Sequence, residues 1–228
     1  MRLARAKLPL LDRWRLLRDP HLRIHYGQSA EDAVLGRLFG QRRGGFYVDI
    51  GAHHPRKLSN THVLHRYFGW TGINVDASER AIALFRAERP GDVNLVALVG
   101  APGAAVTFTE YAGSDGPRST ADPARIARFA GAAVPVRATA TMEPQPLAAI
   151  MEAHAGGRRI DLLTIDIEGF DLQALQSNDW DRFRPAVICV EDFDADGEGS
   201  AIAAWLEGLG YTRVSRCFET SIYRDRAG

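Results

Sequence analysis

The sequence predicts an α/β fold, a doubly wound and mostly parallel β-sheet with helices on both faces. Short apolar runs that suit buried strands alternate with helix-like stretches, which is the pattern of a parallel sheet covered on two sides. Acidic or small polar residues follow the strand-like runs, at the sheet edge where such folds bind ligands. The chain has 228 residues, 46% of them apolar, which is enough for one sizeable core. We therefore predict one domain over residues 29–228, preceded by a basic N-terminal extension over residues 1–28.

The first half of the predicted domain consists of one helix followed by β-α-β-α-β. Each predicted helix starts at a serine or asparagine that suits an N-cap and stops at a glycine or before a proline. The predicted helices begin at Ser29, at Ser59 or Asn60, and at Ser78, and they end at Gly40, near Gly69 and before Pro90. The predicted strands are residues 46–50, 72–75 and 93–99. This order is typical of the mononucleotide-binding half of a doubly wound fold.

The second half begins with a stretch rich in Gly, Pro, Ala and Thr, for which the sequence predicts only a strand at residues 106–109 and a loop at residues 113–122. Strands and helices then alternate again, and the last two strands are expected to form a hairpin-like pair. The remaining predicted elements are helices at residues 147–154, after Gly169 and at 201–209, and strands at residues 160–165, 186–190, 211–217 and 220–224.

The ends of the first two predicted strands suit a nucleoside. Gly51 permits a tight turn, and Asp76 lies 25 residues further on, close to the spacing at which an acid binds both hydroxyls of a ribose. The alternative for Asp76 is a helix N-cap. The residues after Gly51 do not complete a G-x-G-x-x-G motif, so a dinucleotide with its pyrophosphate is disfavoured. S-adenosylmethionine, which has no phosphate, needs only the turn, the acid and donors for its amino-acid end.

Several blocks in a fixed order resemble the FkbM family of methyltransferases. They are YGQSAED, FYVDIGAHHPRKLSNT, GWTGINVDAS, RPGDVNLVALVG, IDLLTIDIEGFDLQALQSNDW and RPAVICVE, and they cover Tyr26 to Asp192. The resemblance implies a class I, Rossmann-like methyltransferase fold with a seven-stranded sheet. It also implies an S-adenosylmethionine-dependent enzyme that O-methylates a hydroxyl of a sugar, glycan, glycolipid or polyketide-type acceptor. One departure is Ala30, where the first block usually has glycine.

The same resemblance implies a cofactor pocket at the ends of the first two strands. The implied cofactor-binding residues are Asp49, Gly51, Ala52, Asp76 and Ala77, with Ser59, Asn60 and Thr61 near the methionine moiety. A helix that starts at Ser59 would present free backbone N–H groups, which suit the carboxylate of the cofactor. The alternative for Ser59, Asn60 and Thr61 is plain helix capping.

Three residues are candidates for the acid–base chemistry. Asp166 and Glu168 follow the strand predicted at residues 160–165, and a carboxylate there can take the proton of an acceptor hydroxyl. Such a base is needed because an alcohol is a poor nucleophile until its proton leaves. His54, in a His-His pair after the first strand, is a candidate base of another kind. The alternative for His54 is a residue that shapes the turn before Pro55.

A magnesium site is a further prediction at these strand ends. Asp166, Glu191 and Asp192 follow two predicted strands, and hard oxygen ligands from adjacent strand ends suit Mg²⁺. The alternative is a set of solvated acids without a metal.

Composition excludes several classes of protein. The 28 basic and 28 acidic residues give no net charge, which disfavours nucleic acid as a partner. Two cysteines in apolar runs make neither a disulfide framework nor a zinc site, and no apolar stretch is long enough for a membrane span. We therefore expect a cytoplasmic protein that acts on a small-molecule or glycan acceptor. The alternatives are a non-catalytic or a nicotinamide-nucleotide-binding protein of the same fold.

The N-terminal extension carries a local positive charge. It has seven basic and two acidic residues, and leucines lie between them. Such a segment is suited to peripheral contact with the anionic inner face of a membrane. The alternative is a helix that covers the sheet or contacts a second copy of the chain in a homo-oligomer.

Overall fold

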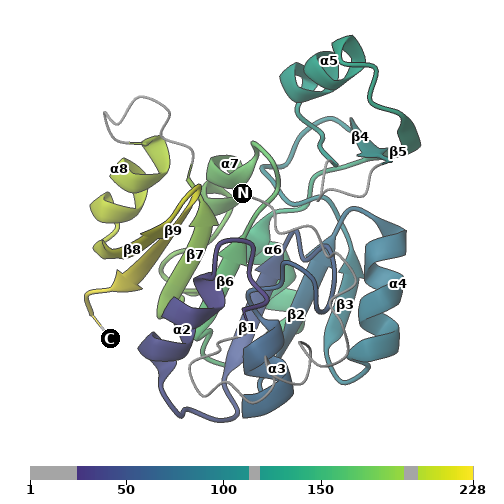
Figure 1. Cartoon of the computed structure of the whole chain (residues 1–228). Helices are drawn as coiled ribbons and strands as arrows, with labels where there is room; N and C mark the ends of the chain where they lie inside the picture. The colour runs from purple at the N-terminus through teal and green to yellow at the C-terminus, as the bar shows by residue number, and fades with distance from the viewer. Residues whose placement is uncertain (1–24, 113–118, 193–199, 228) are drawn as a thin grey trace.

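The computed structural model describes residues 25–112, 119–192 and 200–227. Its main feature is a seven-stranded sheet with the strand order β3-β2-β1-β6-β7-β9-β8 (Figure 1). The strands are β1 (Phe46–Ile50), β2 (Thr71–Asp76), β3 (Val93–Val96), β6 (Leu162–Ile165), β7 (Val187–Glu191), β8 (Tyr211–Cys217) and β9 (Thr220–Asp225). β9 is antiparallel to both of its neighbours, and the other pairs are parallel. The predicted seven-stranded, mostly parallel sheet is therefore confirmed.

Helices cover both faces of the sheet, and the two-residue period of the strands determines what each face contacts. In β1 the side chain of Tyr47 points to one face, and those of Val48 and Ile50 point to the other. The face of Tyr47 is covered by α2 (Glu31–Phe39), α3 (His62–Phe68) and α4 (Glu79–Glu88). The opposite face is covered by α6 (Leu147–His154), α7 (Asp171–Gln176) and α8 (Ala201–Gly208). This is the predicted doubly wound arrangement.

The predicted N-cap of α2 is wrong. Ala30 occupies the N-cap position, in a left-handed conformation with φ of 65°, and makes no side-chain cap. The N–H of Ser29 instead donates to the carboxylate of Glu31, at 2.8 and 3.1 Å. The acid in the first turn therefore accepts the N–H of the residue that is expected to be the cap. The predicted helix end at Gly40 is confirmed.

The helix caps after β1 and β2 differ in how well the sequence predicts them. The N-cap of α3 is Thr61 rather than Ser59 or Asn60. The N-cap of α4 is Ser78, as predicted, and its hydroxyl accepts the N–H of Ala81 at 3.3 Å. β3 ends at residue 96, three residues earlier than the predicted strand.

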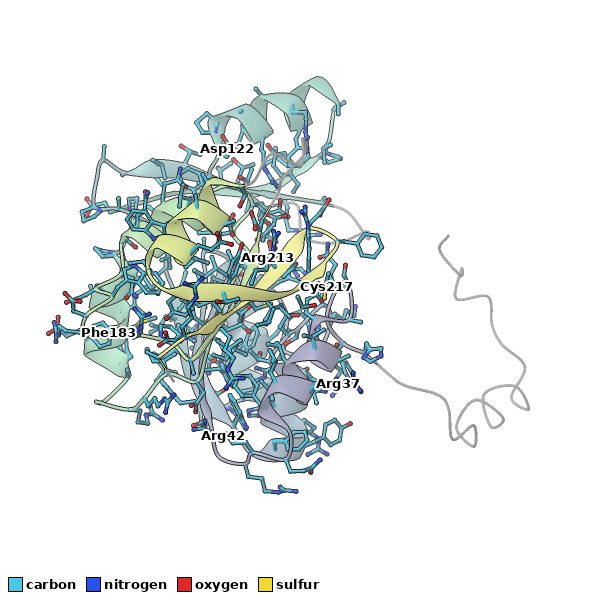
Figure 2. All side chains as sticks on the ribbon, turned by 90° about the vertical axis from the view of Figure 1, so that its left-hand side faces the viewer. Arg37, Arg42, Asp122, Phe183, Arg213 and Cys217 are labelled. Carbon is cyan, nitrogen blue, oxygen red and sulfur yellow. The ribbon has the colours of Figure 1, made fainter. Side chains whose placement is uncertain are left out.

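The middle of the chain forms a separate unit of β4 (Val106–Tyr111), α5 (Pro123–Gly131) and β5 (Val136–Met142). β4 and β5 pair as a two-stranded antiparallel ribbon outside the main sheet. We call β4, residues 119–122, α5 and β5 the inserted unit. In Figure 1 it lies above the carboxyl ends of the strands, and Figure 2 shows Asp122 of this unit at the opposite end of the molecule from Arg42, which precedes β1.

The sequence predicts only part of the inserted unit. The strand at residues 106–109 is confirmed, whereas α5 and β5 are not predicted. Residues 113–118 of the predicted loop lie outside the described residues.

The prediction for the N-terminal extension falls largely outside the described residues, which begin at residue 25. Its membrane and homo-oligomer alternatives therefore stay predictions. Along the described part of the chain, none of the helices has the length and apolarity of a membrane span.

Candidate active site

A cavity of about 1070 Å³ lies at the carboxyl ends of β1, β2 and β6, under the inserted unit. The strand ends and the turns that follow them contribute Gly51, His53, His54, Asp76, Ala77, Asp166 and Glu168. The inserted unit contributes Phe108, Tyr111, Thr120, Ala121 and Arg137, and the N-terminal loop contributes residues 25–28. Six of the predicted site residues therefore line one cavity: Gly51, His54, Asp76, Ala77, Asp166 and Glu168.

The turn after β1 fixes two walls of this cavity to each other. Gly51 has φ of 77°, and a Cβ atom at this position would lie 1.9 Å from the carbonyl oxygen of Asp166. The N–H groups of Gly51 and Ala52 both donate to the carbonyl of Val75, at 2.9 and 3.0 Å. Ala52 packs its side chain against Ile82 of α4, away from the cavity. Only glycine fits where the ends of β1 and β6 approach so closely.

Asp76 presents a carboxylate to the cavity that is already held by two backbone donors. It accepts the N–H of His53 and the N–H of Ser78, each at 2.8 Å. A carboxylate has about four acceptor positions, so roughly half of its capacity remains for a ligand. Burial raises the pKa of Asp76 above its ordinary value, while the two N–H bonds oppose that rise. The N–H bonds also fix the direction of the carboxylate.

Three of the predicted cofactor residues do not line the cavity and form a buried network instead. The hydroxyl of Thr61 donates to Asp49 at 2.8 Å. The guanidinium of Arg89 donates to the hydroxyls of Thr61 and Ser59, at 2.9 and 3.3 Å. Burial raises the pKa of Asp49 to about 6, and Thr61 and Arg89 oppose that rise. These residues therefore hold the loop between β1 and α3 from within.

Arg89 is the residue of this network that the sequence does not single out. It is 2% exposed, and it also donates to the carbonyl of Pro55 and, at 2.9 Å, to the hydroxyl of Tyr47. Tyr47 in turn donates to the buried carboxylate of Asp92. An arginine before a proline at a helix end, with Glu88 and Asp92 nearby, is usually exposed, so the local sequence gives no signal of its burial.

Asn60, between the two buried hydroxyls, points toward the N-terminal loop. Its Nδ2 donates to Thr164 at 3.3 Å. A Cβ atom on Gly27 would lie 2.9 Å from its Oδ1 and 2.5 Å from the carboxylate of Glu31. Asn60 therefore lies behind the N-terminal loop and, unlike Gly27, does not line the cavity.

The two histidines after β1 have different surroundings. Burial, aided by the positive charges of His54 and Arg80, lowers the pKa of His53 to about 4. The Nδ1 of His54 accepts the N–H groups of Arg56 and Lys57, at 3.0 and 3.2 Å. This pattern places the ring proton of a neutral His54 on Nε2. His54 thus shapes the turn, and its remaining nitrogen is a donor.

The carboxylates after β6 and β7 meet a cation from the inserted unit. Asp166 lines the cavity, and burial together with the negative charge of Glu191 raises its pKa well above the ordinary value. Glu168, in a left-handed conformation with φ of 57°, forms an ion pair with Arg125 of α5. Arg125 also lies 3.7 Å from Glu191. The sequence does not predict Arg125 because it does not predict α5.

The predicted magnesium site is not supported by the arrangement of its three residues. Asp192 is fully buried and accepts the hydroxyl of Tyr223 at 2.8 Å, and Glu191 faces Arg125. Within residues 25–112, 119–192 and 200–227, no group of three or more metal-binding side chains gathers in one place. Two of the three acids, Asp192 and Glu191, already contact a tyrosine and an arginine, so we derive no step through a metal.

We expect Mg²⁺ to leave the melting temperature of this protein unchanged. A bound metal would raise the melting temperature, because a ligand that binds only the folded state stabilises it. Melting curves in millimolar Mg²⁺ and in excess EDTA should therefore coincide. A Mg²⁺-dependent rise that disappears in Glu191→Gln would instead restore the metal site.

Comparison with known proteins agrees with this geometry. Residues 49–213 match the family model described as the methyltransferase FkbM domain, which is well over half of the chain. No curated protein matches the chain. The matched range begins at Asp49 in β1 and contains every strand end that lines the cavity, together with the inserted unit.

Proposed function

Because the chain belongs to the FkbM family of methyltransferases, we propose that it transfers the methyl group of S-adenosylmethionine to a hydroxyl oxygen. The proposed acceptors are sugars, glycans, glycolipids and polyketide-type molecules. The observation that carries the proposal is the cavity of about 1070 Å³, which exceeds the roughly 300–1,000 Å³ of an ordinary single-ligand pocket. A cavity just above this range is consistent with a donor and an acceptor that share it.

The donor fits the side of the cavity formed by the ends of β1 and β2. Asp76 has acceptor capacity left for the two ribose hydroxyls, and Ala77 next to it offers a small apolar surface. The tight turn at Gly51 lets the ligand approach the backbone. Beneath this wall, Arg89 fixes the loop that carries Ser59.

Asp166, at the end of the neighbouring strand β6, is our proposed base. A raised pKa brings a carboxyl closer to the operating pH, where a general base is most effective. The positive sulfonium of the donor would favour the ionised form of Asp166. In the proposed step, the acceptor hydroxyl gives its proton to Asp166 while its oxygen forms a bond to the methyl carbon. The bond between that carbon and sulfur breaks, and S-adenosylhomocysteine and a methyl ether leave.

Replacing Asp76 by alanine is expected to weaken the binding of S-adenosylmethionine by about 2–3 kcal/mol, because two hydrogen bonds from the ribose to a charged group are lost. This corresponds to roughly a 30- to 150-fold rise in Kd, which isothermal titration calorimetry can measure. Glu79→Ala is the matched control, since its carboxylate is close in sequence but mostly exposed. Equal affinity in Asp76→Ala and the wild type would remove Asp76 from the donor site. NADH serves as the comparison ligand, and no binding is expected.

A further inference from the structure

Arg125 brings one positive charge of the inserted unit to two neighbouring strand ends. Its guanidinium forms an ion pair with Glu168, which follows β6, and lies 3.7 Å from Glu191 at the end of β7. The side chains of Arg125, Glu168 and Glu191 are only 24, 20 and 14% exposed. An ion pair so far from bulk water is stronger than one on the surface.

Further contacts hold the start of α5 against the loop after β6. The hydroxyl of Thr120 donates to the carbonyl of Glu168 at 3.1 Å. Asp122 caps α5 through the N–H of Ala124, at 2.9 Å. A Cβ atom on Gly169 would lie 3.3 Å from the Asp122 carboxylate and 3.5 Å from Nε of Arg125. The packing of these two segments therefore fixes the position of Arg125.

The titratable groups that face this guanidinium are acidic. From the ends of β6 and β7, α7 and the N-cap of α5, they are Asp166, Glu168, Glu191, Asp171 and Asp122. Glu31 of α2 acts on Asp166, and Glu219 in the turn between β8 and β9 acts on Glu191. Burial is the main cause that raises the pKa of Asp166 and Asp171 and brings that of Glu191 to about 7. Arg125 opposes the rise at all three groups.

We propose that Arg125 is a positioning residue for methyl transfer, which holds Glu168 and Glu191 in place and keeps the acceptor end of the cavity negatively charged. The inference rests on the proposed function, because the negative charge is what would meet the sulfonium and accept the proton. Arg125 thereby supplies, from the inserted unit, the positive charge that the sequence assigned to Mg²⁺. Removing it should raise the pH at which the carboxyls around Asp166 ionise.

The test compares S-adenosylmethionine with S-adenosylhomocysteine, since only the first carries the sulfonium charge. Their affinities are measured by calorimetry from about pH 5.5 to 9, a range on both sides of the pKa of about 7 of Glu191. In the wild type, the preference for S-adenosylmethionine should rise with pH as the carboxyls ionise. In Arg125→Met the midpoint of that rise should move up by about one pH unit, and in Arg125→Lys it should stay near the wild-type value.

Arg128→Met is the matched control, because Arg128 lies on the same helix and is exposed. It should keep the wild-type midpoint. A folded Arg125→Met with an unchanged midpoint overturns the inference. If Arg125→Met does not fold, Glu168→Gln provides the test. This change frees Arg125 to act on Glu191, so the midpoint should fall. An unchanged midpoint in Glu168→Gln again overturns the inference. A wild type that binds neither ligand refutes the proposed function itself.

Discussion

Replacing Arg89 by methionine should lower the free energy of unfolding by about 3–5 kcal/mol, as expected when one member of a buried charged network is removed. Methionine fills much of the same space but leaves Asp49 and Asp92 buried without the cation. It also removes the donor to the carbonyl of Pro55. For a domain of this size the melting temperature should fall by roughly 10 °C. Differential scanning calorimetry would measure both quantities.

The loss of stability in Arg89→Met should depend on pH. The folded-state pKa of Asp49 is about 6, above its ordinary value, and Arg89 helps to keep it from rising further. An acid whose pKa is higher in the folded than in the unfolded state stabilises the fold at low pH. This stabilisation is lost as the pH rises through the folded-state pKa. Without Arg89 that pKa is higher still, so the difference from the wild type should be smaller near pH 5 than near pH 8.

Arg86→Met is the matched control for Arg89→Met. Arg86 is on the same helix, but it is half exposed, and Glu79 is its one ionic partner among the described residues. Its loss should change stability by about 0.5 kcal/mol or less. If Arg89→Met were no less stable than Arg86→Met, the network would not hold the loop after β1.

The strands of the main sheet could be predicted because their apolar runs are local and continuous. β1 matches the predicted strand residue for residue, and β8 does as well. Their neighbours differ by a few residues at most, apart from β3. The predicted strands also predict where the cavity lies, since the ends of parallel strands meet at one edge of the sheet. Gly51, Asp76 and Asp166 were thus placed together before any contact was known.

The buried network could not be predicted because long-range contacts define it, whereas α5 and β5 of the inserted unit are missed although they carry local signals. Arg89 contacts Ser59, 30 residues earlier in the chain, and nothing in the local sequence marks that contact. The sequence of β5, VRATATM, alternates apolar and polar residues although the strand is almost fully exposed. Asp122 followed by Pro123 is likewise typical of a helix start. The magnesium prediction finds no support in the described residues, and only the position of α5 shows that Arg125 lies beside Glu191, one of the three predicted ligands.

Replacing Gly51 by alanine should abolish tight binding of S-adenosylmethionine. The added Cβ would lie 1.9 Å from the carbonyl oxygen of Asp166 and 2.8 Å from its carbonyl carbon. Neither atom can move freely, because the N–H of Asp166 donates to Ile50 at 3.0 Å and that of Gly51 donates to Val75 at 2.9 Å. The ends of β1 and β6 must therefore separate, and both walls of the cavity shift. We expect affinity to fall at least about 100-fold, or roughly 3 kcal/mol.

Gly69→Ala separates this steric effect from the cost of a positive φ. Gly69 has φ of 66°, close to the 77° of Gly51, but a Cβ there would meet nothing within 4 Å. Alanine at position 69 should cost about 1–2 kcal/mol of stability for its left-handed conformation and leave the affinity for S-adenosylmethionine unchanged. Circular dichroism first establishes that both variants are folded, and calorimetry then measures binding. Wild-type affinity in Gly51→Ala would mean that the donor does not need the close approach of β1 and β6, and that it binds elsewhere than at the turn after β1.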